Sequence, residues 1–240
     1  MLKVLDLFSG IGGFSLGLER TGGFETVAFC EIDPFCQKIL KKHWPTVPIF
    51  NDVKDLNYEG EVDVITGGFP CQPFSTASRG RKTAEDLWPI MANTIKKYNP
   101  KIWIAENVQR ECIERAADFA RVLGYSVAVK CIGAHDAGAD HKRNRWWLCA
   151  HPYDQSEFYS SLDAEVASLP QLCFGLWGRE NYARTFRISN GLSNRMDRFR
   201  SLGNTVLPQI PQIIGNVILR LTPSTQAHRG AFGWMGCLVT

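Results

Sequence analysis

The 240-residue sequence lacks several features that would place it in a special class of protein. It has no apolar run near the roughly 18 residues that a membrane-spanning helix needs. An acid, Asp6, interrupts the short apolar stretch at its N-terminus, which argues against a secretory signal there. Its 27 Lys and Arg residues nearly balance its 24 Asp and Glu residues. We therefore expect no membrane association and a cytoplasmic location.

The eight cysteines contain no C-x-x-C pair. This absence argues against a zinc site, because zinc ligands commonly come in such pairs. In a chain without an export signal, the cysteines are expected to be reduced thiols, most of them buried. We predict no bound metal.

The charges that are present are unevenly distributed. Residues 1–70 hold six Lys and Arg against ten Asp and Glu, whereas residues 179–200 hold six Arg against two acids. An acidic first part and a basic later part favour two functions on two faces of the molecule. Uneven solvation of unrelated surfaces would explain the same charges.

The first 150 residues alternate short apolar runs with stretches typical of helices. We predict strands over 3–7, 26–31, 62–66, 101–105, 126–131 and 145–149, and helices over 14–19, 34–43, 86–98 and 110–123. This alternation indicates an α/β fold with a doubly wound, mostly parallel sheet. Its ligands are then expected at the carboxyl ends of the strands, near the point where the strand order reverses.

After residue 150 this alternation stops. Residues 151–190 have no clear period, so we expect an irregular insertion there. We treat residues 151–194 as a segment separate from the α/β part of the chain. Regularity returns in residues 195–221, with a helix over 207–221, and residues 222–240 are expected to form a loosely held tail.

A glycine-rich turn, Phe8-Ser9-Gly10-Ile11-Gly12-Gly13, follows the first predicted strand and precedes a helix. Glycines let the backbone approach a ligand closely, although such a turn also serves tight packing alone. Glu31 ends the next strand, where a carboxylate accepts ribose hydroxyls, and Asp52 follows the third apolar run. Asp52 is either a ligand of an adenine amino group or a simple helix cap.

Cys71 lies in Gly67-Gly68-Phe69-Pro70-Cys71-Gln72-Pro73, directly after a predicted buried strand. The Gly and Pro residues predict an exposed turn, and a thiolate there is a strong nucleophile. Two further segments place polar side chains at the end or the start of a predicted strand. Glu106 ends another strand, and Arg143 and Arg145 share a face as the last strand begins. A basic cluster of that sort is also typical of a solvated surface.

In order, the segments DLFSGIGG, Glu31, Asp52, GFPCQPFS, ENV, the R-x-R pair and LGNTV resemble the motifs of the DNA (cytosine-5) methyltransferases. The resemblance covers residues 3–150 and 195–220. It implies a class I methyltransferase fold and methyl transfer from S-adenosylmethionine to cytosine C5 in duplex DNA. In that reaction the base is flipped out of the helix.

The resemblance also assigns roles to residues. It implies that Cys71 adds to C6 of the base, that Glu106 holds and protonates N3, that Arg145 contacts the base carbonyl, and that Arg143 steadies Glu106 or a flanking phosphate. The cofactor residues it implies are Phe8, Gly10, Ile11, Gly12, Gly13, Glu31, Ile32, Asp52, Val53, Asn204 and Val206. The residues expected to contact DNA are Gln72, Ser75, Arg79, Arg81, Arg184, Arg187 and Arg195.

The sequence departs from the family pattern at three places. His141 replaces the usual glutamine, Ile32 replaces a larger side chain over the adenine, and the insertion before LGNTV is short, at about 45 residues. A target-recognition segment of that length predicts a short or degenerate DNA target. The resemblance is compatible with a monomer and with a cognate restriction endonuclease as partner.

Three alternatives remain at this stage. An RNA cytosine-5 methyltransferase would share the fold and the chemistry. A pyrimidine-nucleotide methylase that uses folate also has a Pro-Cys nucleophile, although FSGIGG followed by Glu31 argues against it. A catalytically silent DNA-binding relative would have no need of Cys71, Glu106 and Arg145 together.

Overall fold

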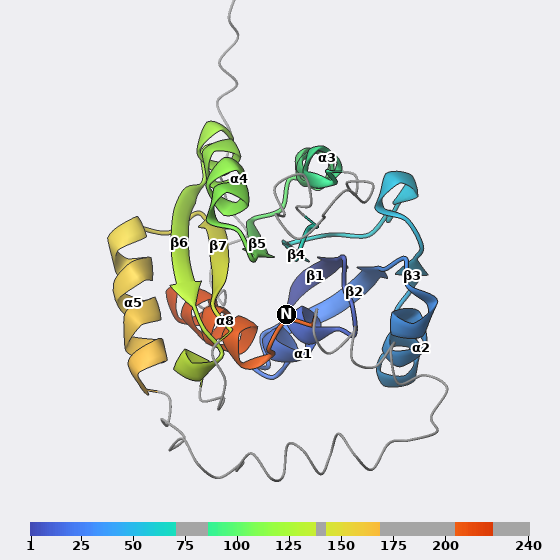
Figure 1. The fold of residues 1–240 in the computed structure, drawn as a ribbon, viewed down its shortest axis with the longest axis horizontal. Coiled ribbons are helices and arrows are strands. Elements are labelled where there is room, and N and C mark those ends of the chain that lie inside the picture. The colour runs from blue at the N-terminus through green and yellow to red at the C-terminus, as the bar shows by residue number, and fades with distance from the viewer. Residues whose placement is uncertain (71–85, 138–142, 169–204, 223–240) are drawn as a thin grey trace, which may run out of the picture.

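A computed structural model describes residues 1–70, 86–137, 143–168 and 205–222 of the chain. Seven strands form one sheet in the order β3-β2-β1-β4-β5-β7-β6 (Figure 1). All neighbouring strands are parallel except that β7 runs antiparallel to both β5 and β6. The predicted doubly wound, mostly parallel sheet is therefore confirmed. Its strand order reverses between β1 and β4, so ligands are expected above the carboxyl ends of those strands.

The predicted strands and helices are all found, with ends shifted by a few residues at most. The strands are β1 (Leu2–Leu7), β2 (Phe24–Cys30), β3 (Ile49–Phe50), β4 (Val64–Gly67), β5 (Ile102–Asn107), β6 (Ser126–Ile132) and β7 (Arg145–His151). The helices are α1 (Gly13–Glu19), α2 (Pro34–His43), α3 (Trp88–Tyr98), α4 (Arg110–Val122), α5 (Gln155–Ser168) and α8 (Gln209–Leu221), with short 3-10 helices η1 (Val53–Asp55) and η2 (His135–Ala137).

Two apolar layers cover the two faces of the sheet. On one face, α8 packs against both α1 and α5, and these helices cover residues such as Val4, Val64 and Ile104. On the other face, α3 and α4 pack over Leu5, Ile65 and other residues of the same strands. Alternate residues of each strand thus enter opposite layers, as expected for a sheet buried on both sides. Because both faces of the sheet are covered by apolar side chains, polar side chains for a site are expected at the ends of the strands.

Helix α5 was not predicted, and the expectation of irregular structure from residue 151 is wrong for residues 155–168. Only Phe158 and Leu162 of this helix are buried, so its apolar period is weak. Its start is nevertheless marked in the sequence, because the Asp154 carboxylate accepts a hydrogen bond from the Glu157 N–H at 2.9 Å. An Asp followed three residues later by Glu is typical of a helix N-terminus.

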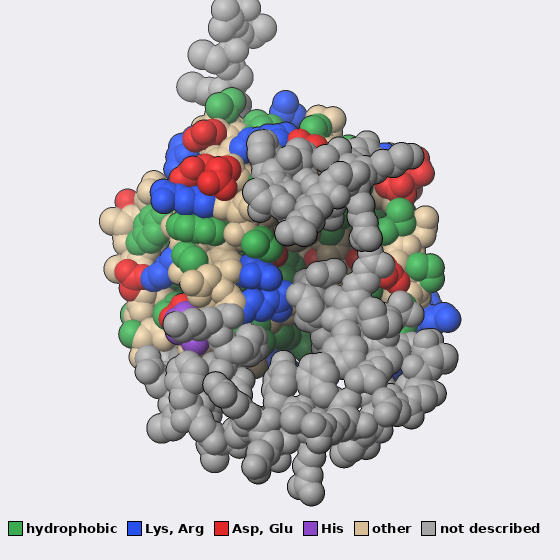
Figure 2. Space-filling view, viewed as in Figure 1, with side chains coloured by type: hydrophobic (Ala, Val, Ile, Leu, Met, Phe, Trp, Pro, Cys, Tyr) green, Lys and Arg blue, Asp and Glu red, His purple; other side chains and the backbone are tan. Residues whose placement is uncertain are grey.

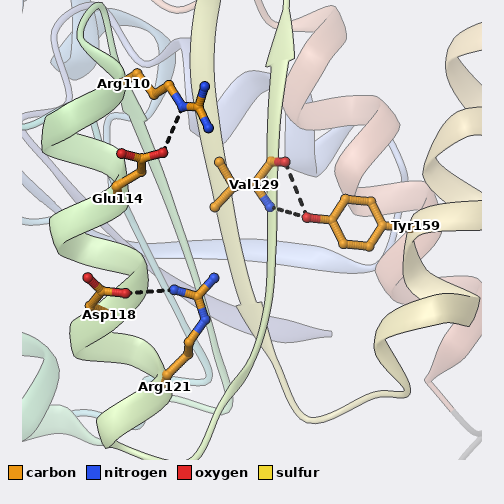
Figure 3. A network of polar contacts seen from close by, with 6 residues as sticks. All are labelled: Arg110, Glu114, Asp118, Arg121, Val129 and Tyr159. Atoms are coloured by element: carbon orange, nitrogen blue, oxygen red, sulfur yellow. Dashed lines mark hydrogen bonds and ion pairs between the residues drawn. The ribbon is translucent and has the colours of Figure 1, made fainter.

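Tyr159 joins α5 to the edge of the sheet. Its hydroxyl accepts a hydrogen bond from the N–H of Val129 at 2.8 Å and donates to the carbonyl of the same residue, in edge strand β6 (Figure 3). An uncovered edge strand would offer those groups to another chain. Residues 155–168 therefore form a helix that packs in the α/β layers, and residues 169–194 of the predicted recognition segment 151–194 lie outside the described residues.

The surface of α4 carries two ion pairs between neighbouring turns, Arg110–Glu114 and Arg121–Asp118 (Figure 3). Both are exposed and together contribute little to stability. No helix within the described ranges is long and apolar enough to cross a membrane.

Most of the described cysteines agree with the prediction of reduced thiols. Cys30, Cys36, Cys131 and Cys149 are reduced thiols, and all but Cys131 are buried. Cys112 differs, because it is disulfide-bonded.

Candidate active site at the carboxyl edge of the sheet

The turn after β1 has a backbone that favours glycine. Phe8, Gly10 and Gly12 all have positive φ, at 52°, 55° and 87°. Ser9 fixes the turn from below, because its hydroxyl donates to the Asp6 carbonyl at 2.6 Å and its N–H donates to the Cys30 carbonyl at 3.2 Å. The turn is thereby tied to the ends of both β1 and β2.

Close contacts close one side of this turn and leave the other side open. A Cβ atom added to Gly13 would lie 2.3 Å from the Val206 carbonyl oxygen, and one added to Gly12 would lie 2.7 Å from the Trp44 ring. A Cβ atom at Gly10 would meet nothing within 4 Å. The predicted Gly10–Gly13 turn and Val206 are therefore brought together, with an open face at Gly10 where a ligand could lie against the backbone.

Glu31 folds back onto this turn. Its carboxylate accepts hydrogen bonds from the N–H groups of Gly10 at 2.6 Å and Asp33 at 2.8 Å. The neighbouring Ile32 is 63% exposed, so it offers an apolar surface beside Glu31. Two of the predicted cofactor residues thus lie together with the glycine turn.

Asp52 caps the short helix η1. Its carboxylate accepts a hydrogen bond from the Lys54 N–H at 2.9 Å, and the predicted cofactor residue Val53 is buried beneath it. Asp52 is therefore a helix cap in this structure, and its role at the adenine stays a prediction. A cap of this kind uses one oxygen, so it leaves the other for a ligand.

Antiparallel β7 brings the predicted basic residues to the same edge. Arg145 pairs with Ile132 at the end of β6, and Trp147 pairs with Glu106 near the end of β5. The Arg145 Nε atom consequently lies 3.0 Å from Glu106 Oε1, with the two side chains 21% and 12% exposed. Burial raises the pKa of the Glu106 carboxyl, and Arg145 and Arg143 oppose this rise.

Arg143 makes a contact that the sequence did not indicate. Its guanidinium donates a hydrogen bond to the Thr205 carbonyl at 2.6 Å, directly before Val206. Burial lowers the pKa of Arg143, as does the neighbouring Arg145, whereas Glu106 raises it. The contact with Thr205 ties Arg143 to the segment that closes the glycine turn, and its two predicted roles stay predictions.

The chain that leads into the Cys71 turn is held against the end of β5. A Cβ atom on Gly68 would lie 3.2 Å from Glu106 Oε2, so the backbone there passes directly beside the carboxylate. The Asn107 side-chain amide donates a hydrogen bond to the Phe69 carbonyl at 2.9 Å. Two successive residues of β5 therefore fix the backbone two and three residues before Cys71.

A narrow pocket of about 10 Å³ lies beside Glu106, Arg143 and Arg145. Its lining comprises Glu106, Ala134, Arg143, Arg145, Trp147, Val206, Leu207 and Ile210. A larger, open cavity of about 440 Å³ lies at the opposite ends of the strands, beside Lys3, Glu25 and Tyr58. It contains none of the predicted site residues, so the narrow pocket is the better candidate.

Several predicted residues lie outside the described residues, and their assignments stay predictions. They are the nucleophile Cys71, the cofactor residue Asn204 and all the expected DNA contacts, namely Gln72, Ser75, Arg79, Arg81, Arg184, Arg187 and Arg195.

In the view of Figure 2 acidic and basic side chains are interspersed on the described surface, with one group of Lys and Arg side chains near the centre.

One buried acid near the site was missed as a candidate. Asp6 is fully buried, and burial raises its pKa to about 7. The sequence does carry a signal for it, because Asp6 is a charged residue within an otherwise apolar predicted strand. Within the ranges that the structure describes, no group of three or more metal-binding side chains occurs.

Comparisons with known proteins agree with this arrangement. A sequence model of the family described as C-5 cytosine-specific DNA methylase matches residues 2–173. The type II methyltransferase M.HgiBI of Herpetosiphon aurantiacus is 36% identical over 159 residues, which are 61% of this chain and 36% of that protein. The type II methyltransferase M.NgoBI of Neisseria gonorrhoeae is 32% identical over 171 residues, covering 66% of this chain and 53% of that protein.

Solved structures show the same fold. The S. pombe Dnmt2 methyltransferase superposes with a TM-score of 0.55 at 20% identity, covering 67% of this chain and 55% of that one. The Entamoeba histolytica methyltransferase EhMeth superposes with a TM-score of 0.52 at 18% identity, covering 64% and 54%. The chain spans between about a third and about half the length of the curated relatives described above.

Proposed function

Because the chain belongs to the family of C-5 cytosine-specific DNA methylases, we propose that it transfers a methyl group from S-adenosylmethionine to C5 of cytosine in duplex DNA. Membership of this family implies cytosine methylation that depends on S-adenosylmethionine. The substrate duplex, the covalent route and the individual residue roles are part of the proposal.

The observation that carries the proposal is the environment of Glu106. Its carboxylate is buried between the Arg145 guanidinium and the backbone at Gly68, three residues before Cys71. A nucleophile on that turn and an acid on β5 would then face the same small volume. This is the arrangement that addition to a ring and protonation of the same ring require.

Cytosine C5 is too weak a nucleophile to attack a methyl group unaided. Addition of the Cys71 thiolate to C6 would break the C5–C6 double bond and turn the ring into an enamine with an electron-rich C5. Glu106 would donate its proton to N3, where negative charge develops. After methyl transfer, passage of the C5 proton to water and return of the N3 proton to Glu106 would re-form the C5–C6 double bond and expel the thiolate.

Burial favours the protonated form of Glu106 that this role requires, since it raises the carboxyl pKa. The Arg145 guanidinium holds the carboxyl in place and has further N–H donors for a base carbonyl oxygen. Arg143, through the Thr205 carbonyl, would hold the Thr205–Val206 segment near the same pocket.

The residues at the first two strands fit the cofactor. When bound, S-adenosylmethionine supplies an electrophilic methyl group. The open face at Gly10 would accept it against the backbone, beside Phe8, Ile11, Gly12 and Gly13, and Val206 and Asn204 would close its methionine end. Glu31 would take the ribose hydroxyls, and Ile32, Asp52 and Val53 would line the adenine.

Access to the ring requires that the base leave the duplex. We assign the covering of the flipped base to residues 72–88 and sequence recognition to residues 151–194, where arginines suit contacts with phosphate and guanine. Action as a monomer, a location in the cytoplasm and a cognate endonuclease stay predictions.

The test is a trap for the covalent step. Duplex DNA containing 5-fluorocytosine at its target, incubated with the protein and S-adenosylmethionine, should form an adduct that resists denaturant, because fluorine at C5 does not leave as a proton does. Cys71→Ala should form none, and Cys149→Ala, which removes a buried free thiol four residues further along β7 than Arg145, should react as the wild type does. Adduct formation by Cys71→Ala, or adducts with RNA of the same sequence in place of DNA, would refute the proposal.

A further inference from the structure

Asp6 is a buried carboxylate that the proposed reaction does not use. It lies in the central strand β1, is fully buried, and shares the face of the sheet that α1 and α8 cover with apolar residues such as Val4 and Ile104. Burying a carboxylate among such residues costs free energy that an apolar side chain would not cost. The contacts of Asp6 show what this carboxylate holds.

The first contact connects Asp6 to the cofactor side. Its Oδ2 atom accepts a hydrogen bond from the Ser15 hydroxyl at 2.8 Å, and the Ser15 backbone N–H donates to it as well. Helix α1 starts after Gly12, which has no side chain to cap the helix. The carboxylate from β1 therefore takes the place of a cap and holds the first turn of α1, and with it the glycine turn.

The second contact connects Asp6 to the catalytic side. Its Oδ1 atom accepts a hydrogen bond from the Thr66 hydroxyl at 2.7 Å, and the two residues are direct partners in the pairing of β1 with β4. Thr66 lies two residues before Gly68, whose backbone passes beside Glu106, and five residues before Cys71. Each oxygen of one carboxylate thus holds a different functional segment.

A carboxylate suits this task because of its geometry. When ionised it only accepts hydrogen bonds, so its donors must point to it, and its two oxygens lie a fixed distance apart. If Ser15 shifted, the Asp6 carboxylate would shift with it, and so would the acceptor of the Thr66 hydrogen bond. An apolar side chain in place of Asp6 would fill the space but would not tie the positions of Ser15 and Thr66 to each other.

We propose that Asp6 is a positioning residue that, through Ser15 and Thr66, holds the cofactor-binding turn in register with the strand leading to Cys71. This inference rests on the proposed methyl transfer, because it assigns the two segments to one reaction. It predicts that the two hydroxyl groups affect different steps, although both bind the same carboxylate.

The experiment removes the hydroxyls one at a time in the full chain. Ser15→Ala should raise the Kd for S-adenosylmethionine, measured by calorimetry without DNA, by about fivefold, with a smaller change in the single-turnover rate at saturating cofactor. Thr66→Val should lower that single-turnover rate about tenfold and leave the Kd within about twofold. Thr66→Ser, which keeps the hydroxyl, should restore the rate.

Thr94→Val is the matched control. Thr94 is also buried, and its hydroxyl donates to the Ile90 carbonyl within α3 at 2.9 Å, away from both segments. It should lower the melting temperature as Thr66→Val does and change neither the Kd nor the rate. In an Asp6→Asn background, the effects of Ser15→Ala and Thr66→Val should shrink, since their shared acceptor is altered.

Two results would overturn the inference. The first is that the wild type methylates cytosine but the Thr66→Val and Thr94→Val variants have equal single-turnover rates. The second is a Thr66→Ser variant as slow as Thr66→Val, which would show that the hydroxyl is irrelevant. A wild type that binds S-adenosylmethionine and methylates no cytosine would instead refute the proposed function, and this inference with it.

Discussion

The two halves of the carboxyl edge hold their polar groups in different ways. In the half formed by β1 and β2, the Glu31 carboxylate accepts two backbone N–H groups, and the glycine turn is closed by contacts with backbone and ring atoms. In the half formed by β5 and β7, the Glu106 carboxylate is buried against the Arg145 guanidinium, with Arg143 nearby. The first half is shaped by the main chain and the second by charged side chains.

This difference teaches which changes each half should tolerate. A cavity shaped by backbone contacts should be sensitive to added volume, because the backbone cannot move aside as a side chain does. A site shaped by buried charges should be sensitive to a lost charge even where the volume is kept. Each prediction below changes one of these properties in one half.

The largest effect is expected where an acid is removed at constant volume in the second half. Glu106→Gln keeps the shape of the side chain but removes the acid, so turnover at saturating DNA and cofactor should fall by about 10²–10⁴-fold, as for a lost general acid. The Kd for S-adenosylmethionine should stay unchanged. Unchanged turnover would contradict the role of Glu106.

Volume added to the first half should act on folding and cofactor binding together. Gly13→Ala would place a Cβ atom 2.3 Å from the Val206 carbonyl oxygen, so the free energy of unfolding should fall by about 1–3 kcal/mol. Denaturation with urea measures this loss. Gly10→Ala is the control, since it meets nothing within 4 Å and is strained only by its positive φ. Equal losses for both variants would mean that the contact with Val206 does not close the turn.

Removal of the Glu31 side chain should weaken cofactor binding more than DNA binding. Glu31→Ala removes a charged acceptor, which corresponds to about tenfold in the Kd for S-adenosylmethionine by calorimetry. Asp52→Ala should act in the same direction. DNA affinity in a gel-shift assay should hold for both, and the reverse pattern would mean that the cofactor site lies elsewhere.

The smallest effect concerns a group that belongs to neither half. His151, at the far end of β7, is fully buried between the rings of Phe158 and Tyr153, and burial lowers its pKa to about 4. The unfolded chain binds a proton near pH 6.5 that the folded protein does not. Stability from neutral His151 is thus present above that pH and is lost as the pH falls toward 4.

Between about pH 7 and 5.5 the expected loss from His151 is about 1 kcal/mol. His151→Gln keeps an acceptor for the Tyr153 N–H, and it should remove this loss, so the difference in free energy of unfolding between variant and wild type should change by about 1 kcal/mol between about pH 7 and 5.5. Equal slopes for the variant and the wild type would show that His151 does not titrate on unfolding.

The sequence predicted the strands and helices well where local signals were strong. Helix α2 begins and ends at the predicted residues because Asp33 caps it and Pro34 occupies its first position. Helix α5 was missed because only two of its residues are buried, so its period is weak. A pattern of strands also carries no direction, and the antiparallel course of β7, which brings Arg145 to Glu106, had to come from the structure.

The site was predictable as a set of segments but not as a set of contacts. The structure places Glu31 beside the glycine turn and Arg145 beside Glu106, and the roles assigned to these residues stay predictions. The hydrogen bond from Arg143 to Thr205 joins residues 62 apart in the chain, and the contacts of Asp6 join three elements. Such contacts depend on how layers pack, which no local pattern encodes.

The central claim is that this chain methylates cytosine in duplex DNA, and bisulfite sequencing tests it most directly. Plasmid DNA should be prepared from cells that express the wild type, Cys71→Ala or Glu106→Gln. The account predicts unconverted cytosines at one short recurring sequence with the wild type, none with Cys71→Ala, and few with Glu106→Gln. Complete conversion of every cytosine in all three samples, with the proteins folded and present, would contradict it.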